Sequence, residues 1–303
     1  MGDRTRRIPH YKSRDRGPLD FKSRPHREMG NIMLLARKPV ITIPPTTRIK
    51  DAAELMVERK VRRLPVTEPG TKKLMGILRT RNIIDFLGGG EKHQIVRVKF
   101  KDNFFAAVNE PVRTIMSQDV THGTVYMSII DAAKILLEKG VGGIPILGEN
   151  EQIEGIVSER DFISYVPATT GVPVSYHMTR HVVTAEPELS IRDAARRMIS
   201  WGFRRLPVVR GRELVGIVTS MDILRYFGTG KVFEYMRSQR MDEAMAVSIQ
   251  EIMARDVLKV APETDVGEAA ALMRERGCGG LPVVSGKRLV GMITEHDLLR
   301  LLV

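Results

Sequence analysis

Apolar and polar positions along the chain form four successive blocks with the same order of periods. In the first block, Ile49, Ala52 and Met56 recur at the three- and four-residue spacing of an amphipathic helix. Short aliphatic runs, such as residues 206–209 and 214–218, are typical of buried strands. A second helical stretch follows the second run. Each block of about 55–60 residues therefore predicts the order strand, helix, strand, strand, helix.

The four blocks are copies of one unit, because they share an internal spacing that chance does not produce. An acidic residue followed by alanine opens each first helix, a proline lies 14 residues later, and a glycine follows after 9 to 11 more. The acidic residues are Asp51, Asp131, Asp193 and Glu268, the prolines are Pro65, Pro145, Pro207 and Pro282, and the glycines are Gly76, Gly155, Gly216 and Gly291. A methionine lies 15 residues before the acidic residue in the last three units (Met116, Met178 and Met253), where the first unit has Ala36.

The units alternate, which indicates that a two-unit block was duplicated. Units one and three carry an arginine pair before the proline, whereas units two and four carry a glycine pair that would leave room there. A single unit leaves one apolar sheet face uncovered, so we expect the units to pack in pairs. The sequence predicts a first pair at residues 39–166 (units at 39–88 and 112–166) and a second at 174–303 (units at 174–230 and 249–303). A turn-rich linker, residues 167–173, separates the pairs.

Charge is concentrated at the start of the chain. Residues 1–38 hold eleven Lys/Arg against four Asp/Glu, whereas the whole chain of 303 residues has a net charge of +12. We interpret this stretch as a basic, flexible arm. It could contact nucleic acid or another polyanion, or it could be a solubilising or packing extension. The absence of interleaved aromatic residues favours the second interpretation.

Several classes of protein are disfavoured by the composition. A single cysteine, Cys278, argues against a disulfide framework and a Cys-rich zinc site, and the seven histidines have no metal-binding spacing. The sequence has neither an apolar run of 18 residues nor a secretory signal, so we expect a cytoplasmic protein without a membrane span. No nucleophile–base constellation is present, so we expect no enzymatic activity.

The strongest candidate chemistry lies after the repeated glycine, where a strand meets a helix. In three units a hydroxyl residue is followed three positions later by aspartate: Ser158 and Asp161, Thr219 and Asp222, Thr294 and Asp297. One interpretation is a helix cap close to the capping box. Another is a ribose site, because an Asp carboxylate can accept both hydroxyls of a cis-diol and helix amides suit phosphate oxygens. The first unit departs from the pattern with Arg79 and Asn82.

The repeated glycine, hydroxyl and aspartate, preceded by the Leu-Pro-Val type of strand, resemble the adenosine-binding signature of CBS (cystathionine-β-synthase) domains. The resemblance covers roughly residues 39–303. It implies an α/β protein of four β-α-β-β-α units in two pseudo-symmetric Bateman pairs that form a disc. The arrangement resembles the γ subunit of AMP-activated protein kinase and stand-alone prokaryotic four-CBS proteins.

The same resemblance implies roles for ten side chains. Asp161, Asp222 and Asp297 would hold ribose, and Ser158, Thr219 and Thr294 would contact ribose or phosphate. The arginine pairs stand where the γ subunit has a phosphate-binding His-Arg pair. Solvated arginines are the alternative, and the site that each would serve stays open. These arginines are Arg62, Arg63, Arg204 and Arg205.

The implied function is a regulatory adenine-nucleotide sensor that binds AMP, ADP or ATP and signals to a separate, unidentified effector protein. S-adenosylmethionine is an alternative ligand, and no further cofactor is implied. We expect a monomeric disc or a homodimer. The alternative function is a nucleic-acid-binding regulator in which residues 1–38 contact phosphates and the repeats are a scaffold.

Overall fold

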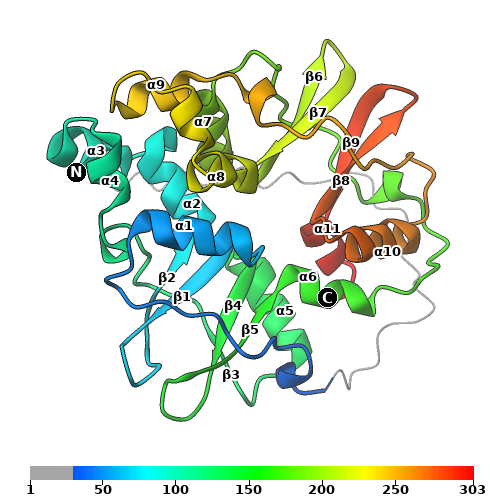
Figure 1. The fold of residues 1–303 in the computed structure, drawn as a ribbon. Coiled ribbons are helices and arrows are strands. Elements are labelled where there is room, and N and C mark those ends of the chain that lie inside the picture. Colours follow the sequence, from blue (N-terminus) through cyan, green and yellow to red (C-terminus); the bar gives the residue numbers. More distant parts are fainter. Residues whose placement is uncertain (1–29) are drawn as a thin grey trace, which may run out of the picture.

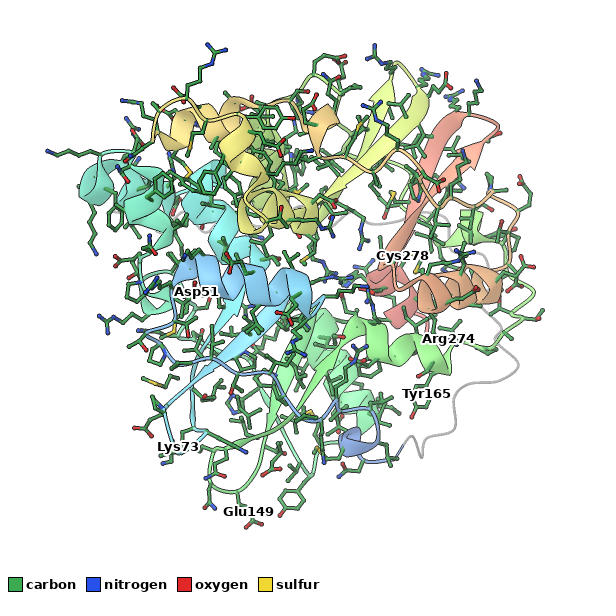
Figure 2. The ribbon with its side chains drawn as sticks, viewed as in Figure 1. Asp51, Lys73, Glu149, Tyr165, Arg274 and Cys278 are labelled. Atoms are coloured by element: carbon green, nitrogen blue, oxygen red, sulfur yellow. The ribbon has the colours of Figure 1, made fainter. Side chains whose placement is uncertain are left out.

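The computed structural model describes residues 30–303, so residues 1–29 of the predicted basic arm lie outside the described residues. Four α/β units form two pairs that together make a disc, which confirms the predicted architecture (Figure 1). Charged side chains such as Lys73, Glu149 and Arg274 are exposed and lie toward the periphery (Figure 2). None of the helices in residues 30–303 has both the length and the apolar character needed to cross a membrane.

The helices and strands of the units follow the predicted order. Unit one has α1 (Ile49–Glu58), β1 (Arg63–Thr67), β2 (Leu74–Arg79) and α2 (Thr80–Ile84), and unit two has β3 (Gly123–Thr124), α5 (Ile129–Glu138), β4 (Gly143–Leu147), β5 (Ile153–Ser158) and α6 (Glu159–Phe162). Unit three has α7 (Ile191–Trp201), β6 (Arg205–Arg210), β7 (Glu213–Thr219) and α8 (Ser220–Gly228), and unit four has α10 (Val266–Arg276), β8 (Gly280–Ser285), β9 (Arg288–Thr294) and α11 (Glu295–Leu299). A π-helical segment, Asp85–Gly89, extends α2, and short helices are inserted within each pair: α3 (His93–Phe100), α4 (Phe104–Val108) and α9 (Met241–Ala246).

The predicted opening strand of each unit is short, and the repeated proline explains why. It survives as β3 in unit two and as single parallel bridges in the others, such as Ile43 with Val66. The amide of Ile43 donates to the Pro65 carbonyl, and the amide of Thr67 donates to the Ile43 carbonyl. The next bond of this ladder would need an N–H at Pro65, which proline lacks.

The repeated glycine and methionine mark the contact within a pair. A side chain added at Gly76 would have its Cβ 2.9 Å from Met116 Sδ, and one at Gly216 would lie 2.7 Å from Met253 Sδ. In each case the methionine belongs to the other unit of the pair. Ala36 takes the corresponding place against Gly155. These sequence signals therefore specify pair packing, with glycine admitting the lead-in segment of the partner unit.

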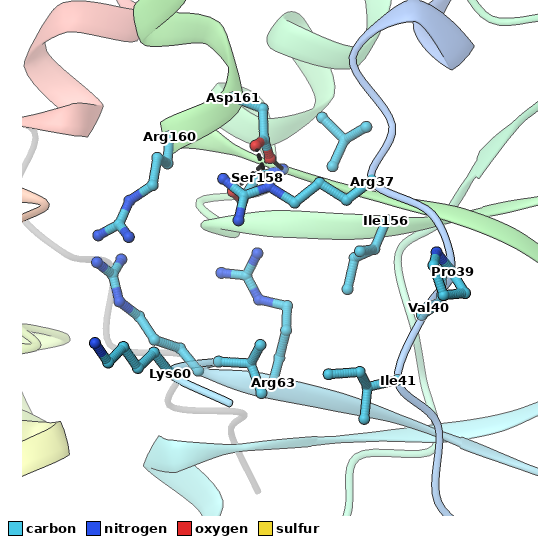
Figure 3. A pocket seen from close by; sticks show the side chains of 13 residues that line it. Arg37, Pro39, Val40, Ile41, Lys60, Arg63, Ile156, Ser158, Arg160 and Asp161 are labelled. Carbon is cyan, nitrogen blue, oxygen red and sulfur yellow. Dashed lines mark hydrogen bonds and ion pairs between the residues drawn. The ribbon is translucent and has the colours of Figure 1, made fainter. Parts of the chain in front are cut away.

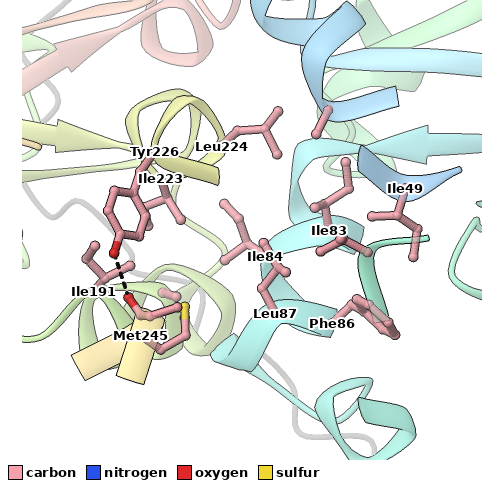
Figure 4. Close-up of a cluster of buried hydrophobic side chains, with 14 of the residues drawn as sticks. Ile49, Ile83, Ile84, Phe86, Leu87, Ile191, Ile223, Leu224, Tyr226 and Met245 are labelled. Carbon is pink, nitrogen blue, oxygen red and sulfur yellow. Dashed lines mark hydrogen bonds between the residues drawn. The ribbon is translucent and has the colours of Figure 1, made fainter. Parts of the chain in front are cut away.

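The two pairs share an apolar core, mainly between units one and three. Ile83, Ile84 and Leu87 of unit one lie opposite Ile223 and Leu224 of unit three in one buried cluster (Figure 4). Units two and four also meet, where Leu299 of α11 joins the core of unit two. Burial of this aliphatic surface supplies the non-directional attraction between the pairs.

Residues 30–38, predicted from the sequence to belong to a flexible arm, pack on unit two. Ile32 is fully buried in the core of that unit, and Asn31 forms a bridge with Ser128. Arg37 forms a backbone bridge with Ile156. The physical reason is the burial of Ile32, against whose core Met33, Leu35 and Ala36 also pack in part, whereas Leu34 stays exposed.

The linker between the pairs predicts a packing test at Gly267, near the start of α10. A Cβ on Gly267 would overlap with the Pro167 carbonyl oxygen and lie 2.5 Å from that of Ala168. We expect Gly267→Ala to lower the free energy of unfolding by about 1–3 kcal/mol, because backbone must shift. Gly228→Ala in α8 is the matched control, since its nearest neighbour is 3.6 Å away. It should be neutral or stabilise by up to about 1 kcal/mol. Equal chemical denaturation midpoints for the two variants would contradict this account.

Candidate functional site

A pocket of about 180 Å³ opens between the two units of the first pair (Figure 3). Unit one contributes the lead-in segment and the loop between α1 and β1 with the start of β1, and unit two contributes the end of β5 and the start of α6. This site is therefore built by both units of the pair. The lining residues are Arg37, Pro39, Val40, Ile41, Lys60, Val61, Arg62, Arg63, Ile156, Val157, Ser158, Arg160 and Asp161.

The aspartate of each motif caps its helix through one carboxylate oxygen. Asp161 Oδ2 accepts hydrogen bonds from the Ser158 amide and hydroxyl, both at 2.7 Å. Asp222 and Asp297 bind Thr219 and Thr294 in the same way. The cap interpretation is therefore confirmed for all three motifs. It leaves Oδ1 of each aspartate as the oxygen for any other donor.

The three remaining oxygens differ in their surroundings. Asp161 Oδ1 accepts from Arg37 Nε at 2.6 Å, and Asp222 Oδ1 accepts from Arg225 at 2.9 Å. Asp297 Oδ1 has no hydrogen-bond partner within residues 30–303. Burial raises the pKa of Asp297, although Thr294 donates two hydrogen bonds to its other oxygen. Asp297 thus offers the carboxylate oxygen that is most open to a new donor.

In the first motif, which departs from the pattern, the polar groups of Arg79 and Asn82 form hydrogen bonds within the protein. Asn82 is buried, and its side-chain oxygen accepts from the Arg79 amide at 2.8 Å. Its side-chain nitrogen donates to Ser117 Oγ at 3.3 Å, as does Arg79. Both ends of the Asn82 amide therefore have partners, and the motif presents no charged acceptor.

The arginine pairs lie over the glycine pairs of the neighbouring units. A side chain at Gly143 would overlap with the guanidinium of Arg63, and one at Gly280 would overlap with that of Arg205. Arg63 thereby enters the Asp161 pocket, and Arg205 lies beside Thr294 of the Asp297 motif. The Asp222 motif, although it shares a unit with Arg205, is paired with unit four, where glycines replace the arginine pair. The geometry thus assigns arginines to the motifs of units two and four.

Arg63 is a buried cation that Glu159 influences through its charge without forming an ion pair with it. Its guanidinium forms no hydrogen bond or ion pair with any residue that the structure describes. Burial, together with the nearby positive charges of Arg204 and Arg62, lowers the pKa of Arg63 to about 9. Burial likewise lowers the pKa of Arg205 to about 10. Such guanidinium groups are stabilised by an anion that brings bidentate acceptors.

Two buried glutamates occupy the centre of the disc. Glu295, 1% exposed, accepts from Arg62 at 3.0 Å and from Arg160 at 2.7 Å. Glu159, 3% exposed, accepts from Arg204 at 2.6 Å and contacts His296 Nδ1 at 2.8 Å.

Burial would raise the pKa of Glu295, but the adjacent Arg62 and Arg160 outweigh it and hold this pKa far below the usual range. Burial would likewise raise the pKa of Glu159, but His296 and Arg204 outweigh it and lower this pKa, so both glutamates are charged.

Four residues of this centre escaped the sequence prediction: Arg37, Glu159, Arg160 and Glu295. A signal for the glutamates was available, because glutamate follows the hydroxyl residue in units two and four but not in units one and three. This is the same alternation as that of the arginine and glycine pairs. Arg37 had no such signal, since it lay in the predicted arm.

A second polar cluster, on the inserted helices, has the residue types of a metal site. Ligand atoms of His93, Asp102 and Asp242 lie within 4.8 Å of one another. However, Arg192 donates to Asp242 at 2.5 Å, and Arg240 lies 3.5 Å from the same carboxylate. The two arginines balance the two carboxylates, so the cluster is explained as an ion-pair network.

Comparisons with known proteins agree with this architecture. Protein MJ1225 of Methanocaldococcus jannaschii is 38% identical over 273 residues, covering 89% of this chain and 98% of that protein. Its crystal structure, described as that of a proposed archaeal homolog of γ-AMPK, matches with a TM-score of 0.84 over 89% of this chain and 99% of that chain. A 33.4 kDa protein in the ribosomal RNA operon of Thermofilum pendens is 31% identical, covering 86% of this chain and 87% of that protein.

The family model described as the CBS domain matches four times, at residues 30–89, 112–168, 174–229 and 249–303. The first match begins at the segment that packs on unit two. Together the matches cover most of the chain, and they coincide with the four structural units. The chain therefore belongs to the CBS domain family, as its repeated motif indicated.

Proposed function

We propose that this chain is a regulatory sensor of adenine nucleotides, with AMP, ADP or ATP as ligands. The observation that carries this proposal is the buried Arg63 guanidinium, which forms no ion pair with any of the described residues and shares a pocket with the Asp161 carboxylate. A nucleotide offers a phosphate for the first group and a ribose diol for the second. The similarity to MJ1225, described as a proposed γ-AMPK homolog, supports the same conclusion.

The lining of the pocket suits the three parts of a nucleotide. Val40, Ile41 and Ile156 provide an apolar wall for the base, Asp161 and Ser158 lie where the ribose would bind, and cationic side chains face the phosphates. Five lining residues are cationic and one is acidic. This charge favours a nucleotide over S-adenosylmethionine, which carries a positive sulfonium and no phosphate.

Regulation follows from the construction of each site by two units. A ligand that contacts both units of a pair stabilises one relative arrangement of them, and it shifts the population toward that arrangement. A separate effector protein would sense the changed surface. We propose this binding role in place of catalysis. The nucleic-acid alternative depends on residues 1–29, which the structure does not describe.

The first prediction concerns Arg63. Arg63→Ala should weaken AMP binding at the Asp161 site at least tenfold, because charge-assisted hydrogen bonds are worth about 1.5–3 kcal/mol each and 1.4 kcal/mol is tenfold. Adenosine, which lacks the phosphate, should bind this variant about as well as the parent. Arg59→Ala, an exposed arginine at the end of α1, is the control. Calorimetric titrations that show equal losses for AMP and adenosine would contradict a phosphate role.

The second prediction compares two aspartates that cap in the same way. Asp297→Ala and Asp222→Ala should each lower stability by about 0.5–2 kcal/mol, the usual loss of a helix cap. Only Asp297→Ala should remove the tightest nucleotide site, because Asp297 has the open oxygen and Arg205 beside it. Melting curves and AMP titrations on both variants separate the roles. If Asp297→Ala melts early but keeps its affinity, Asp297 is a cap alone.

The third prediction concerns Arg37, which occupies the ribose-facing oxygen of Asp161. The corresponding lead-in residues of the other units are Ser117, Thr179 and Ala254. Arg37→Thr should therefore strengthen adenosine binding at this site by up to about fivefold, because an exposed ion pair is worth at most about 1 kcal/mol. Arg225→Ala is the matched change at Asp222. Weaker adenosine binding after Arg37→Thr would show that Arg37 helps to hold the ligand.

A further inference from the structure

Two side chains of the Asp161 site contact a glutamate of the Asp297 site, and two side chains of the Asp297 site contact a glutamate of the Asp161 site. Arg62 and Arg160 line the Asp161 pocket, yet both bind Glu295, two residues before Asp297. Arg204 and His296 occupy the equivalent positions at the Asp297 site. Both contact Glu159, two residues before Asp161. The two sites are thus joined by a reciprocal set of ion pairs across the centre of the disc.

From this arrangement we infer that the Asp161 and Asp297 sites are negatively coupled, so that a nucleotide phosphate at one weakens phosphate binding at the other. The inference rests on the proposed function, because it takes both pockets to be nucleotide sites. Glu159 and Glu295 carry the coupling.

The first step of the coupling is competition for arginine. A phosphate in the Asp161 pocket attracts Arg62 and Arg160, the two partners of Glu295. Glu295 is 1% exposed and cannot remain uncompensated there. The cations that remain near it are Arg204 and Arg205, whose charges already interact with it. These are the arginines that the Asp297 site needs for its own phosphate.

The net charge around the two sites also predicts that a first nucleotide weakens the binding of a second. At the two sites six arginines (Arg37, Arg62, Arg63, Arg160, Arg204 and Arg205) face four carboxylates (Glu159, Asp161, Glu295 and Asp297), which leaves a surplus of two positive charges. The AMP phosphate carries close to two negative charges at pH 7. One AMP is within this surplus, whereas two exceed it. The second nucleotide therefore enters a centre that has already lost most of its positive potential.

The coupling is reciprocal, as linkage between two binding equilibria requires. A phosphate at the Asp297 site would draw Arg204 away from Glu159, which would then compete for Arg63. The expected size is at least about fivefold in the second dissociation constant, the lower end of typical allosteric coupling. A ligand without a phosphate draws on none of these arginines, so it should bind the two sites independently.

Calorimetric titration of the full chain with AMP tests the inference, with adenosine as the uncharged control. With the third motif disabled throughout by Asp222→Ala, Asp161→Ala and Asp297→Ala first give the dissociation constant of each site when the other is also disabled. Two independent sites reproduce the parent isotherm as the sum of these two. Coupling instead makes the second AMP bind at least about fivefold more weakly than the single-site variants predict, while adenosine shows additive binding.

A double variant, Glu159→Gln with Glu295→Gln, tests whether these two glutamates transmit the coupling. It should tighten the first AMP and remove the coupling, because the amides compete weakly for guanidinium. Coupling that persists in this variant, coupling that adenosine also shows, or independent AMP sites would each overturn the inference. If the variant fails to fold, the comparison of AMP with adenosine still decides. Absence of binding by AMP, ADP and ATP alike would refute the proposed function itself, whereas two uncoupled AMP sites refute the coupling alone.

Discussion

Two buried carboxylates constrain the relative placement of all four units. Glu295 of unit four takes its partners from units one and two, and Glu159 of unit two takes its partners from units three and four. A buried charge that loses its partner destabilises a protein by several kcal/mol. The two pairs therefore cannot slide or separate without a large penalty. The apolar contact of units one and three supplies attraction, and these ion pairs supply the register.

The glycine pairs are the steric counterpart of this charge network. Gly143 and Gly280 admit the guanidinium groups of Arg63 and Arg205, so the even units must be small where the odd units are large. Four identical units could not satisfy this requirement. Four arginine pairs would collide and repel, and four glycine pairs would take Arg62 from Glu295 and Arg204 from Glu159. The alternation along the chain is thus a condition for closing the disc.

Local patterns in the sequence predicted the units, their helices and their pairing, because spacing and amphipathic period are local properties. The buried faces of the first helices fall on the expected residues, for example Ile49, Ala52 and Met56. The motif beside which each arginine lies could not be predicted in this way. Arg205 precedes Asp222 in the same unit, yet it lies beside the Asp297 motif, which only the packing of units three and four determines. The packing of residues 30–38 on unit two was also not predicted. The many charged residues before Ile32 outweighed its short apolar run in the sequence analysis.

The capping role of the motif aspartates supports their proposed ligand role. Two hydrogen bonds from the same hydroxyl residue fix each carboxylate through Oδ2, so Oδ1 is held in place before any ligand arrives. A preorganised acceptor loses little side-chain freedom on binding. The three motifs are equal in this respect, and they differ in the residue next to Oδ1: Arg37, Arg225 or none within the described chain. A match to the motif therefore identifies candidate sites, whereas residues outside the motif determine which of them is open.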